Sequence, residues 1–182
     1  MKARLLAFVV LAFSLTPGSV LAQSQAKAPQ FDGSLKSFVA AMTPLTEQSL
    51  GSLDDRVIVV TFFASWCPPC RPEFGHLNEV RQAFSEKDVT ILAVNLFEDF
   101  FKKGMKRRMA RFLAATKPSF AVLRSAKDSE IEKRFGGVDR IPTVYIFDRT
   151  GKPVFTFIHQ VNAKKTHATA EELTAALRRL VP

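Results

Sequence analysis

Apolar and polar positions follow two different periods along the chain, and the change between them predicts strands and helices in turn. Val57–Phe63 and residues 89–97 are β-branched and aromatic with no polar alternation, which is typical of strands buried on both faces. Between them, the apolar spacing predicts a helix over residues 71–85, because one helix face repeats every three to four residues. The apolar residues on that face are Phe74, Leu77, Val80 and Phe84.

The second half of the chain continues this alternation and then changes. We expect a helix over residues 99–116, a short strand over residues 119–124, and a helix over residues 128–137 with Asp128 as its N-cap. Two β-rich runs flank residues 149–152, which predicts a hairpin. The apolar side of the first helix comprises Phe101, Met105, Met109, Phe112 and Leu113.

The order of these elements predicts the fold class. A capping box formed by Thr169 and Glu172 predicts a last helix near the C-terminus. The weak pattern of residues 35–55 is compatible with a short helix and an edge strand. Alternating strands and helices followed by a hairpin predict an α/β fold, with a central mixed β-sheet and helices on both faces.

The N-terminal residues have the layout of an export signal. Lys2 and Arg4 precede an apolar run over residues 5–15, and Val20 and Ala22 fit a cleavage site. We therefore expect a signal peptide over residues 1–22, a flexible segment over 23–34 and one domain over 35–182. The alternative is an uncleaved N-terminal anchor. A periplasmic location follows from the export signal.

The net charge of the chain gives limited information about its binding partners. The 182-residue chain carries a formal net charge of +9, which favours acidic partners or anionic lipid surfaces. No nucleic-acid motif is visible, so we expect no nucleic acid to bind. Six basic residues crowd the predicted helix at 99–116, either as a docking face for an acidic partner or anionic membrane, or as a solvated surface. They are Lys102, Lys103, Lys106, Arg107, Arg108 and Arg111.

The two cysteines of the chain, Cys67 and Cys70, lie between the first buried strand and the helix that follows. A disulfide that closes so short a loop removes little entropy from the unfolded chain, so it is a weak structural staple. The pair is better explained as a redox reagent. A small structural disulfide or a buried pair of free thiols is the alternative.

Two segments resemble a known family. The sequence WCPPC (Trp66, Cys67, Pro68, Pro69, Cys70) follows a strand and precedes a helix, and RIPTVYIFDRTGK (residues 140–152) opens the hairpin. With the export signal, these segments are similar to the TlpA-like periplasmic thiol–disulfide oxidoreductases of the thioredoxin superfamily. The resemblance implies a thioredoxin-like fold and no cofactor beyond the Cys67–Cys70 disulfide. The three histidines match no metal-ligand spacing, so we expect no metal.

The resemblance also implies roles for individual residues. Cys67, at a helix N-terminus that stabilises a thiolate, would attack a substrate disulfide, and Cys70 would resolve the mixed disulfide. Pro142 would be cis, and Ile141 would offer its backbone to an extended substrate. Trp66 would supply an apolar surface beside Cys67. The substrates would be disulfide-containing proteins, such as apo-cytochromes c or oxidase assembly factors. A transmembrane thiol donor would reduce the protein, which would act as a monomer.

Four residues bear on the expected direction of electron flow and on the proton chemistry. Pro68 and Pro69 donate no N–H to sulfur, which favours a reductant, although prolines are also suited simply to start a helix. Thioredoxin has a buried Asp where this chain has Thr61. Glu73 is therefore a candidate for proton transfer to and from Cys70, with an exposed helix carboxylate as the alternative.

Two other functions remain open from the residues alone. A thiol oxidase or isomerase would use the same two cysteines. A Cu(I) carrier would bind the metal through both thiolates, since soft thiolates suit Cu(I). Copper carriers of this fold usually have a wider C-x-x-x-C spacing and a late His, for which His159 is the nearest match.

Overall fold

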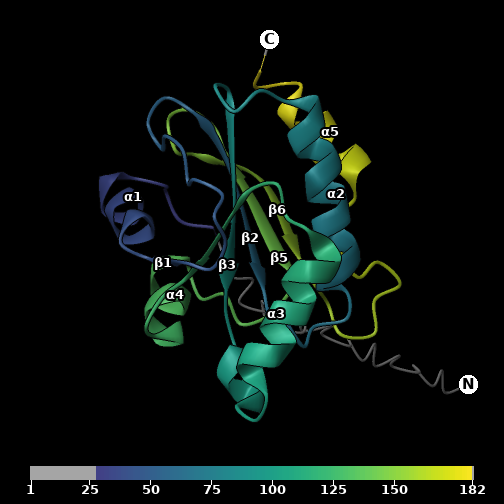
Figure 1. Cartoon of the computed structure of the whole chain (residues 1–182). Coiled ribbons are helices and arrows are strands. Elements are labelled where there is room, and N and C mark those ends of the chain that lie inside the picture. The colour runs from purple at the N-terminus through teal and green to yellow at the C-terminus, as the bar shows by residue number, and fades with distance from the viewer. Residues whose placement is uncertain (1–27, 182) are drawn as a thin grey trace, which may run out of the picture.

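The computed structural model describes residues 28–181, and their strands form one six-stranded mixed sheet (Figure 1). The strands are β1 Thr43–Pro44, β2 Val57–Phe63, β3 Val89–Asn95, β4 Ala121–Arg124, β5 Thr143–Phe147 and β6 Pro153–Ile158. They lie in the order β1–β4–β3–β2–β5–β6. β4, β3 and β2 run parallel, whereas β1, β5 and β6 join antiparallel. The predicted signal peptide, residues 1–22, lies outside the described residues.

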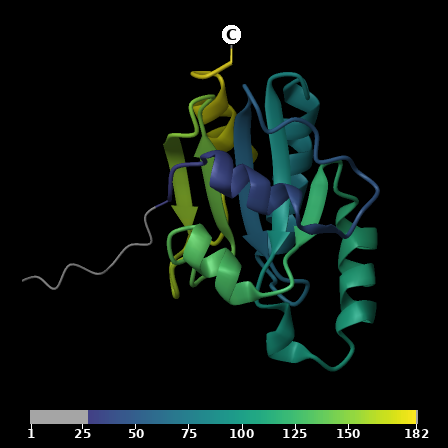
Figure 2. The same ribbon diagram turned by 90° about the vertical axis from the view of Figure 1, so that its left-hand side faces the viewer.

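Helices cover both faces of this sheet, which confirms the predicted architecture. The helices are α1 Gly33–Ala40, α2 Cys70–Ala83, η1 Glu98–Phe101, α3 Met105–Thr116, α4 Asp128–Arg134 and α5 Ala170–Leu177. α2, α3 and α5 lie on one face, and α1 and α4 cover the other (Figures 1 and 2). Across residues 28–181, the structure contains no helix with the length and apolar character that a membrane span requires.

The central strand β2 is buried on both faces, which explains its unbroken apolar sequence. Phe62 packs its ring 4.8 Å from the ring of Phe135, which follows α4. Phe63 points to the opposite face, with its ring 4.8 Å from that of Phe74 and 5.2 Å from that of Phe112. Successive strand residues alternate between faces, so both helix layers are packed against β2.

The prediction of a flexible segment over residues 23–34 is wrong for its last seven residues. Phe31 is 1% exposed and packs its ring 5.1 Å from that of Phe147. The Phe31 N–H donates to the Gly151 carbonyl (2.8 Å). Gly151 has φ 82°, and a Cβ there would lie 2.4 Å from the Phe31 carbonyl oxygen, so glycine permits this close approach. One buried aromatic anchors a stretch whose polar composition suggested flexibility.

The helix predicted over residues 99–116 is two elements. η1 ends at Phe101, and Gly104, with φ 74°, precedes the start of α3 at Met105. The break turns Phe101 away from the apolar side of α3, and its side chain is 56% exposed. Glycine at a left-handed position interrupts the helix that the apolar spacing alone predicted.

Two predicted helix starts have different outcomes. The N-cap of α4 is Lys127, not Asp128, whose carboxylate instead accepts a hydrogen bond from the Phe97 N–H (2.9 Å). Asp128 therefore ties the end of β3 to α4. At α5 the capping box is confirmed: Thr169 caps the helix and the Glu172 side chain accepts from the Thr169 N–H.

Candidate active site

The two cysteines form a disulfide at the end of the sheet where β2 ends. The Cys67 N–H donates to the Ala64 carbonyl (3.1 Å), which closes the turn after the strand. Cys70 is the first residue of α2, so the positive end of the helix dipole lies beside the pair. Cys67 is 2% exposed and Cys70 is fully buried. An approaching molecule therefore reaches Cys67 first.

The two prolines shape the turn between the cysteines. Pro69 is the N-cap residue of α2 and supplies no side-chain cap. The Pro68 carbonyl accepts from the Arg71 N–H (3.3 Å), which starts the helical turn. Because neither proline has an N–H, the turn offers no donor at these two positions to a Cys67 thiolate.

Glu73 is buried next to Cys70, so its interpretation as an exposed helix carboxylate is wrong. It follows Cys70 by three residues and therefore lies on the same face of α2. Thr61 of β2 donates its hydroxyl to one Glu73 oxygen (2.5 Å), and the Ala168 N–H donates to the other (3.3 Å). Burial raises the pKa of Glu73 to about 7, although both hydrogen bonds act to lower it.

The segment before β5 lies at the same end of the sheet as the cysteines. Phe62 pairs with Thr143, so residues 141 and 142 come next to the turn that follows β2. The Ile141–Pro142 bond is cis, as the resemblance implied. The Pro142 carbonyl accepts from the His159 N–H (3.0 Å), whereas Ile141 makes no backbone hydrogen bond within residues 28–181. The backbone N–H and C=O of Ile141 are therefore without a backbone partner in this part of the chain.

Trp66 is held from the other side by the segment after β3. Its indole N–H donates to the Phe97 carbonyl (2.9 Å). Its ring centroid lies 6.1 Å from that of Phe100 and 5.3 Å from that of Phe101. The position of Trp66 thus depends on η1 and on the residue that precedes it.

A buried carboxylate fixes the residue before Trp66, and sequence analysis did not identify it. Glu98 is 1% exposed and accepts from the Ser65 N–H (2.8 Å) and from the Asn95 amide (3.0 Å). It also accepts the Ser65 hydroxyl. Arg108 of α3 completes the cluster with an ion pair to Glu98 (3.4 Å) and a hydrogen bond to the Ser65 hydroxyl (3.1 Å).

A hollow of about 570 Å³ opens beside Cys67. Arg71 of α2 and Arg108 and Arg111 of α3 contribute to its lining. Arg140, which precedes Ile141, is not among the residues that line this hollow. It donates to the Gln160 side chain (2.6 Å) and approaches Asp139 (3.8 Å). The residues that line the hollow are Ser65, Trp66, Cys67, Pro68, Arg71, Arg108 and Arg111.

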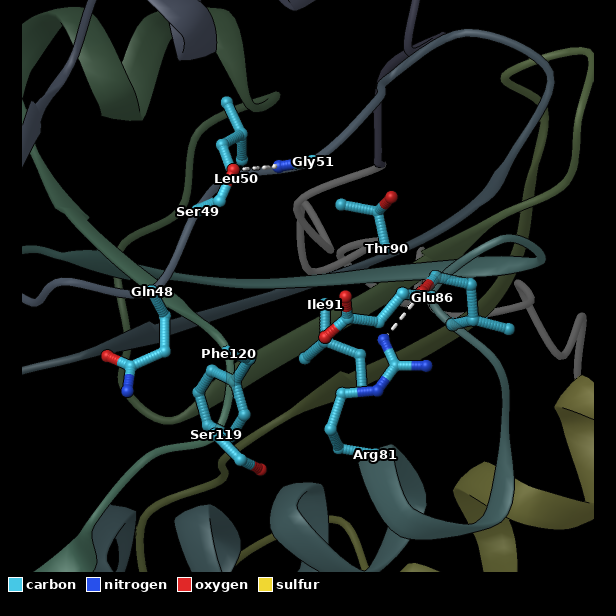
Figure 3. Close-up of a pocket in the computed structure, with 11 residues that line it drawn as sticks. Gln48, Ser49, Leu50, Gly51, Arg81, Glu86, Thr90, Ile91, Ser119 and Phe120 are labelled. Atoms are coloured by element: carbon cyan, nitrogen blue, oxygen red, sulfur yellow. Dashed lines mark hydrogen bonds between the residues drawn. The ribbon is translucent and has the colours of Figure 1, made fainter.

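A second hollow, of about 300 Å³, lies at the opposite end of the sheet, where β3 begins (Figure 3). The guanidinium of Arg81, which lines this hollow, is already hydrogen-bonded within the protein. Arg81 donates to the Val89 carbonyl (2.7 Å) and to that of Phe84. This hollow is far from the cysteines in the fold, and its arginine braces the end of α2 against β3.

Comparisons with known proteins agree with this arrangement. Thiol-disulfide oxidoreductase ResA of Geobacillus thermodenitrificans is 26% identical over 106 residues, which are 58% of this chain and 56% of that protein. The chain thus matches little more than half the length of that relative. StoA from Bacillus subtilis has a TM-score of 0.54 at 23% identity and covers 68% of this chain and 84% of its own.

A second solved structure is a secreted Mycobacterium tuberculosis disulfide oxidoreductase homologous to Escherichia coli DsbE. Its TM-score is 0.54 at 24% identity, with 70% of this chain and 84% of that chain covered. These structures share the thioredoxin-like α/β fold with this chain. The family model described as Redoxin matches residues 23–175. Since that match covers most of the chain, the protein belongs to the Redoxin family.

Proposed function

We propose that this protein is an exported thiol–disulfide oxidoreductase that reduces disulfides in extracytoplasmic proteins. The observation that carries the proposal is the bonded Cys67–Cys70 pair at the N-terminus of α2, with Cys67 at the surface side and Cys70 inside. The Ile141–Pro142 segment supports it, because it lies at the same end of the sheet as the cysteines. The cysteine pair is the redox group, and the proposal needs no further cofactor.

The reaction has two thiol–disulfide exchange steps. The Cys67 thiolate attacks one sulfur of the substrate disulfide, forms a mixed disulfide and releases the other substrate sulfur as a thiolate that takes up a proton. The Cys70 thiolate then attacks Cys67, which forms the Cys67–Cys70 disulfide and releases the second substrate thiolate. Two electrons pass from the dithiol to the substrate, and both substrate sulfurs end as thiols.

Glu73 is placed to move the proton that the second step requires. Cys70 is buried and must lose its proton before it attacks. Glu73 lies one helical turn away, and its pKa of about 7 lets it accept or return a proton near neutral pH. Glu73 thus takes the part of the buried Asp that thioredoxin has at the position of Thr61. Thr61 itself donates a hydrogen bond to Glu73.

The direction of electron flow is argued from the turn. With prolines at positions 68 and 69, the reduced form gains no stabilising N–H donors from these residues. A less stabilised dithiol gives up its electrons more readily. We therefore favour a reductase over an oxidase or isomerase that would use the same cysteines.

Location and partners follow from different observations. The basic and apolar N-terminal pattern indicates export, and one relative of the same fold is described as secreted. A periplasmic reductant needs a transmembrane thiol donor, because that compartment is kept oxidising. Apo-cytochromes c and oxidase assembly factors are the proposed substrates, and the protein is proposed to act as a monomer.

Two measurements test the proposal. The Cys70→Ser variant should accumulate a mixed disulfide through Cys67, while Cys67→Ser should form none and should not reduce insulin. The equilibrium reduction potential should be about −250 mV or lower, as for thioredoxin. A potential near about −120 mV would reverse the proposed direction. Failure of both cysteine variants to change insulin reduction would contradict the assigned chemistry.

A further inference from the structure

The approach to Cys67 is narrow, and its walls are charged. Cys67 is 2% exposed, and the hollow described above has this residue on its lining. Ser65, Pro68, Arg71 and Arg111 line the hollow together with this cysteine. The residues that flank a substrate disulfide entering by this hollow therefore come close to the two arginines.

The positive charge of these walls is only partly balanced. Arg108 is paired with the buried Glu98. Arg71 and Arg111 are exposed and make no ion pair within residues 28–181. Asp99, which follows Glu98 in η1, is paired with Arg124 on β4 (3.0 Å). Because an open guanidinium binds carboxylates through two parallel hydrogen bonds, the hollow is suited to acidic side chains.

Next to the hollow lies an exposed apolar surface formed by two aromatic residues that contact Trp66. Phe100 and Phe101 of η1 are 73% and 56% exposed, and both rings contact Trp66. Exposed aromatic rings that adjoin a reactive site are characteristic of protein-binding surfaces. The Arg108 guanidinium lies 6.0 Å from the centre of the Phe101 ring, so the charged and apolar parts are continuous.

We propose that this surface selects protein disulfides flanked by an acidic residue that binds Arg71 and Arg111, next to an apolar residue that packs on Phe100 and Phe101. The inference rests on the proposed function and names its substrate class. A protein segment fits better than a lipid surface, because the cysteine lies inside a concave hollow that a flat bilayer does not enter. The helix dipole of α2 adds further attraction for the acidic group.

The experiment compares three disulfide substrates with the reduced, full-length protein. Two are peptides with one disulfide and one apolar residue, which differ only in having Glu or Lys beside the cysteine. The third is bis(2-hydroxyethyl) disulfide, which is small and uncharged. The acidic peptide should be reduced at least about tenfold faster than the basic peptide at low salt, in the range of electrostatically steered reactions. The ratio should fall as salt rises.

The double variant Arg71→Glu/Arg111→Glu should reverse the preference between the two peptides. The ratio of their rates cancels any change that the variant causes in the reactivity of Cys67. The matched control is Lys133→Glu/Arg179→Glu, which changes the net charge equally at exposed positions outside the hollow. The control should keep the preference of the unmodified protein. Phe100→Ser should slow both peptides several-fold relative to the neutral disulfide, and this ratio cancels any change in the reactivity of Cys67.

Three outcomes would overturn the inference. Equal rates on both peptides, with the neutral disulfide still reduced, would refute it and leave the proposed function intact. An equal loss of preference in the control variant would assign the effect to net charge. Equal peptide rates together with sedimentation on phosphatidylglycerol vesicles that Arg71→Glu/Arg111→Glu abolishes would assign the hollow to a lipid surface. No reduction of any substrate would instead refute the proposed function.

Discussion

Two buried carboxylates flank the two cysteines, and they differ in their partners. Glu98 lies beside the turn that carries Cys67, with an arginine and three further hydrogen bonds around it. Glu73 lies beside Cys70 and receives two hydrogen bonds, from Thr61 and from the Ala168 backbone. Both side chains are almost completely shielded from water. The first has a cation as a partner and the second has none.

This difference gives the two carboxylates different roles: Glu98 is a structural brace, and Glu73 is a proton carrier. A buried carboxylate with a guanidinium and several donors is compensated for the water it has lost, so it holds its neighbours in place. A buried carboxylate with two neutral donors is compensated only in part, and its pKa rises to about 7. The brace positions Ser65 and Trp66 around the nucleophile, and the proton carrier serves the resolving cysteine.

The same substitution at the two sites should have opposite effects on stability. We expect Glu98→Gln to lower the free energy of unfolding by about 3 kcal/mol or more, because Arg108 and the donors on Ser65 and Asn95 lose a charged acceptor. Urea unfolding at pH 8 measures the change. A loss below about 1 kcal/mol would show that Glu98 is not a brace.

Glu73→Gln should stabilise the oxidised protein at high pH. The folded pKa of Glu73, about 7, lies above the reference value of 4.5. Its contribution to stability is therefore full below pH 4.5 and is lost as pH rises through 7. The loss amounts to about 3 kcal/mol at pH 8 and above, at 1.36 kcal/mol for each pKa unit. Unfolding curves from pH 4.5 to 8.5 should show this slope in the unmodified protein and not in Glu73→Gln.

The same variant should also slow the resolving step. Loss of a general base typically costs about 10²-fold, so the mixed disulfide at Cys67 should persist longer at pH 7. Stopped-flow mixing with a fluorescent disulfide peptide reports its lifetime. Attack by Cys67 should keep its rate, since Glu73 serves the other cysteine. Equal slowing of both steps would indicate a general distortion of α2 in place of lost proton transfer.

Thr61→Val should have the smallest effect and should act through Glu73. Removing the hydroxyl donor takes away an interaction that lowers the pKa of Glu73, so that pKa should rise above 7. The stability lost at neutral pH should be about 1 kcal/mol, as for one hydrogen bond. The pH midpoint of the resolving step measures the shift. An unchanged midpoint would show that Thr61 does not tune this acid.

Strong local patterns made most of the fold predictable. β2 has the predicted bounds because a strand buried on both faces is built almost entirely from apolar residues, with Thr61 as its one polar member. The capping box at Thr169 depends on contacts only three residues apart. Gly104 was missed because one glycine within an amphipathic pattern is a weak signal, whereas its left-handed conformation ends the helix.

The sequence predicted the two cysteines of the candidate site, but it did not predict that two acidic side chains are buried beside them. Burial of Glu73 depends on Ala168, 95 residues away, which no local pattern reports. One signal was available, since Glu73 lies at helical spacing from Leu77 and Val80 on the apolar face of α2. Glu98 gave no such signal, because its partners come from the turn after β2, from β3 and from α3.

The anchoring of Phe31 to Gly151 determines how the molecule can be handled. β5 runs antiparallel to β2, so the β5–β6 turn lies at the pole of the sheet opposite the disulfide. The chain therefore enters the folded unit at that far pole. An affinity tag or a surface linkage attached ahead of residue 28 would hold the domain with its cysteine pole facing outward, and immobilised protein could be used to capture its substrates directly.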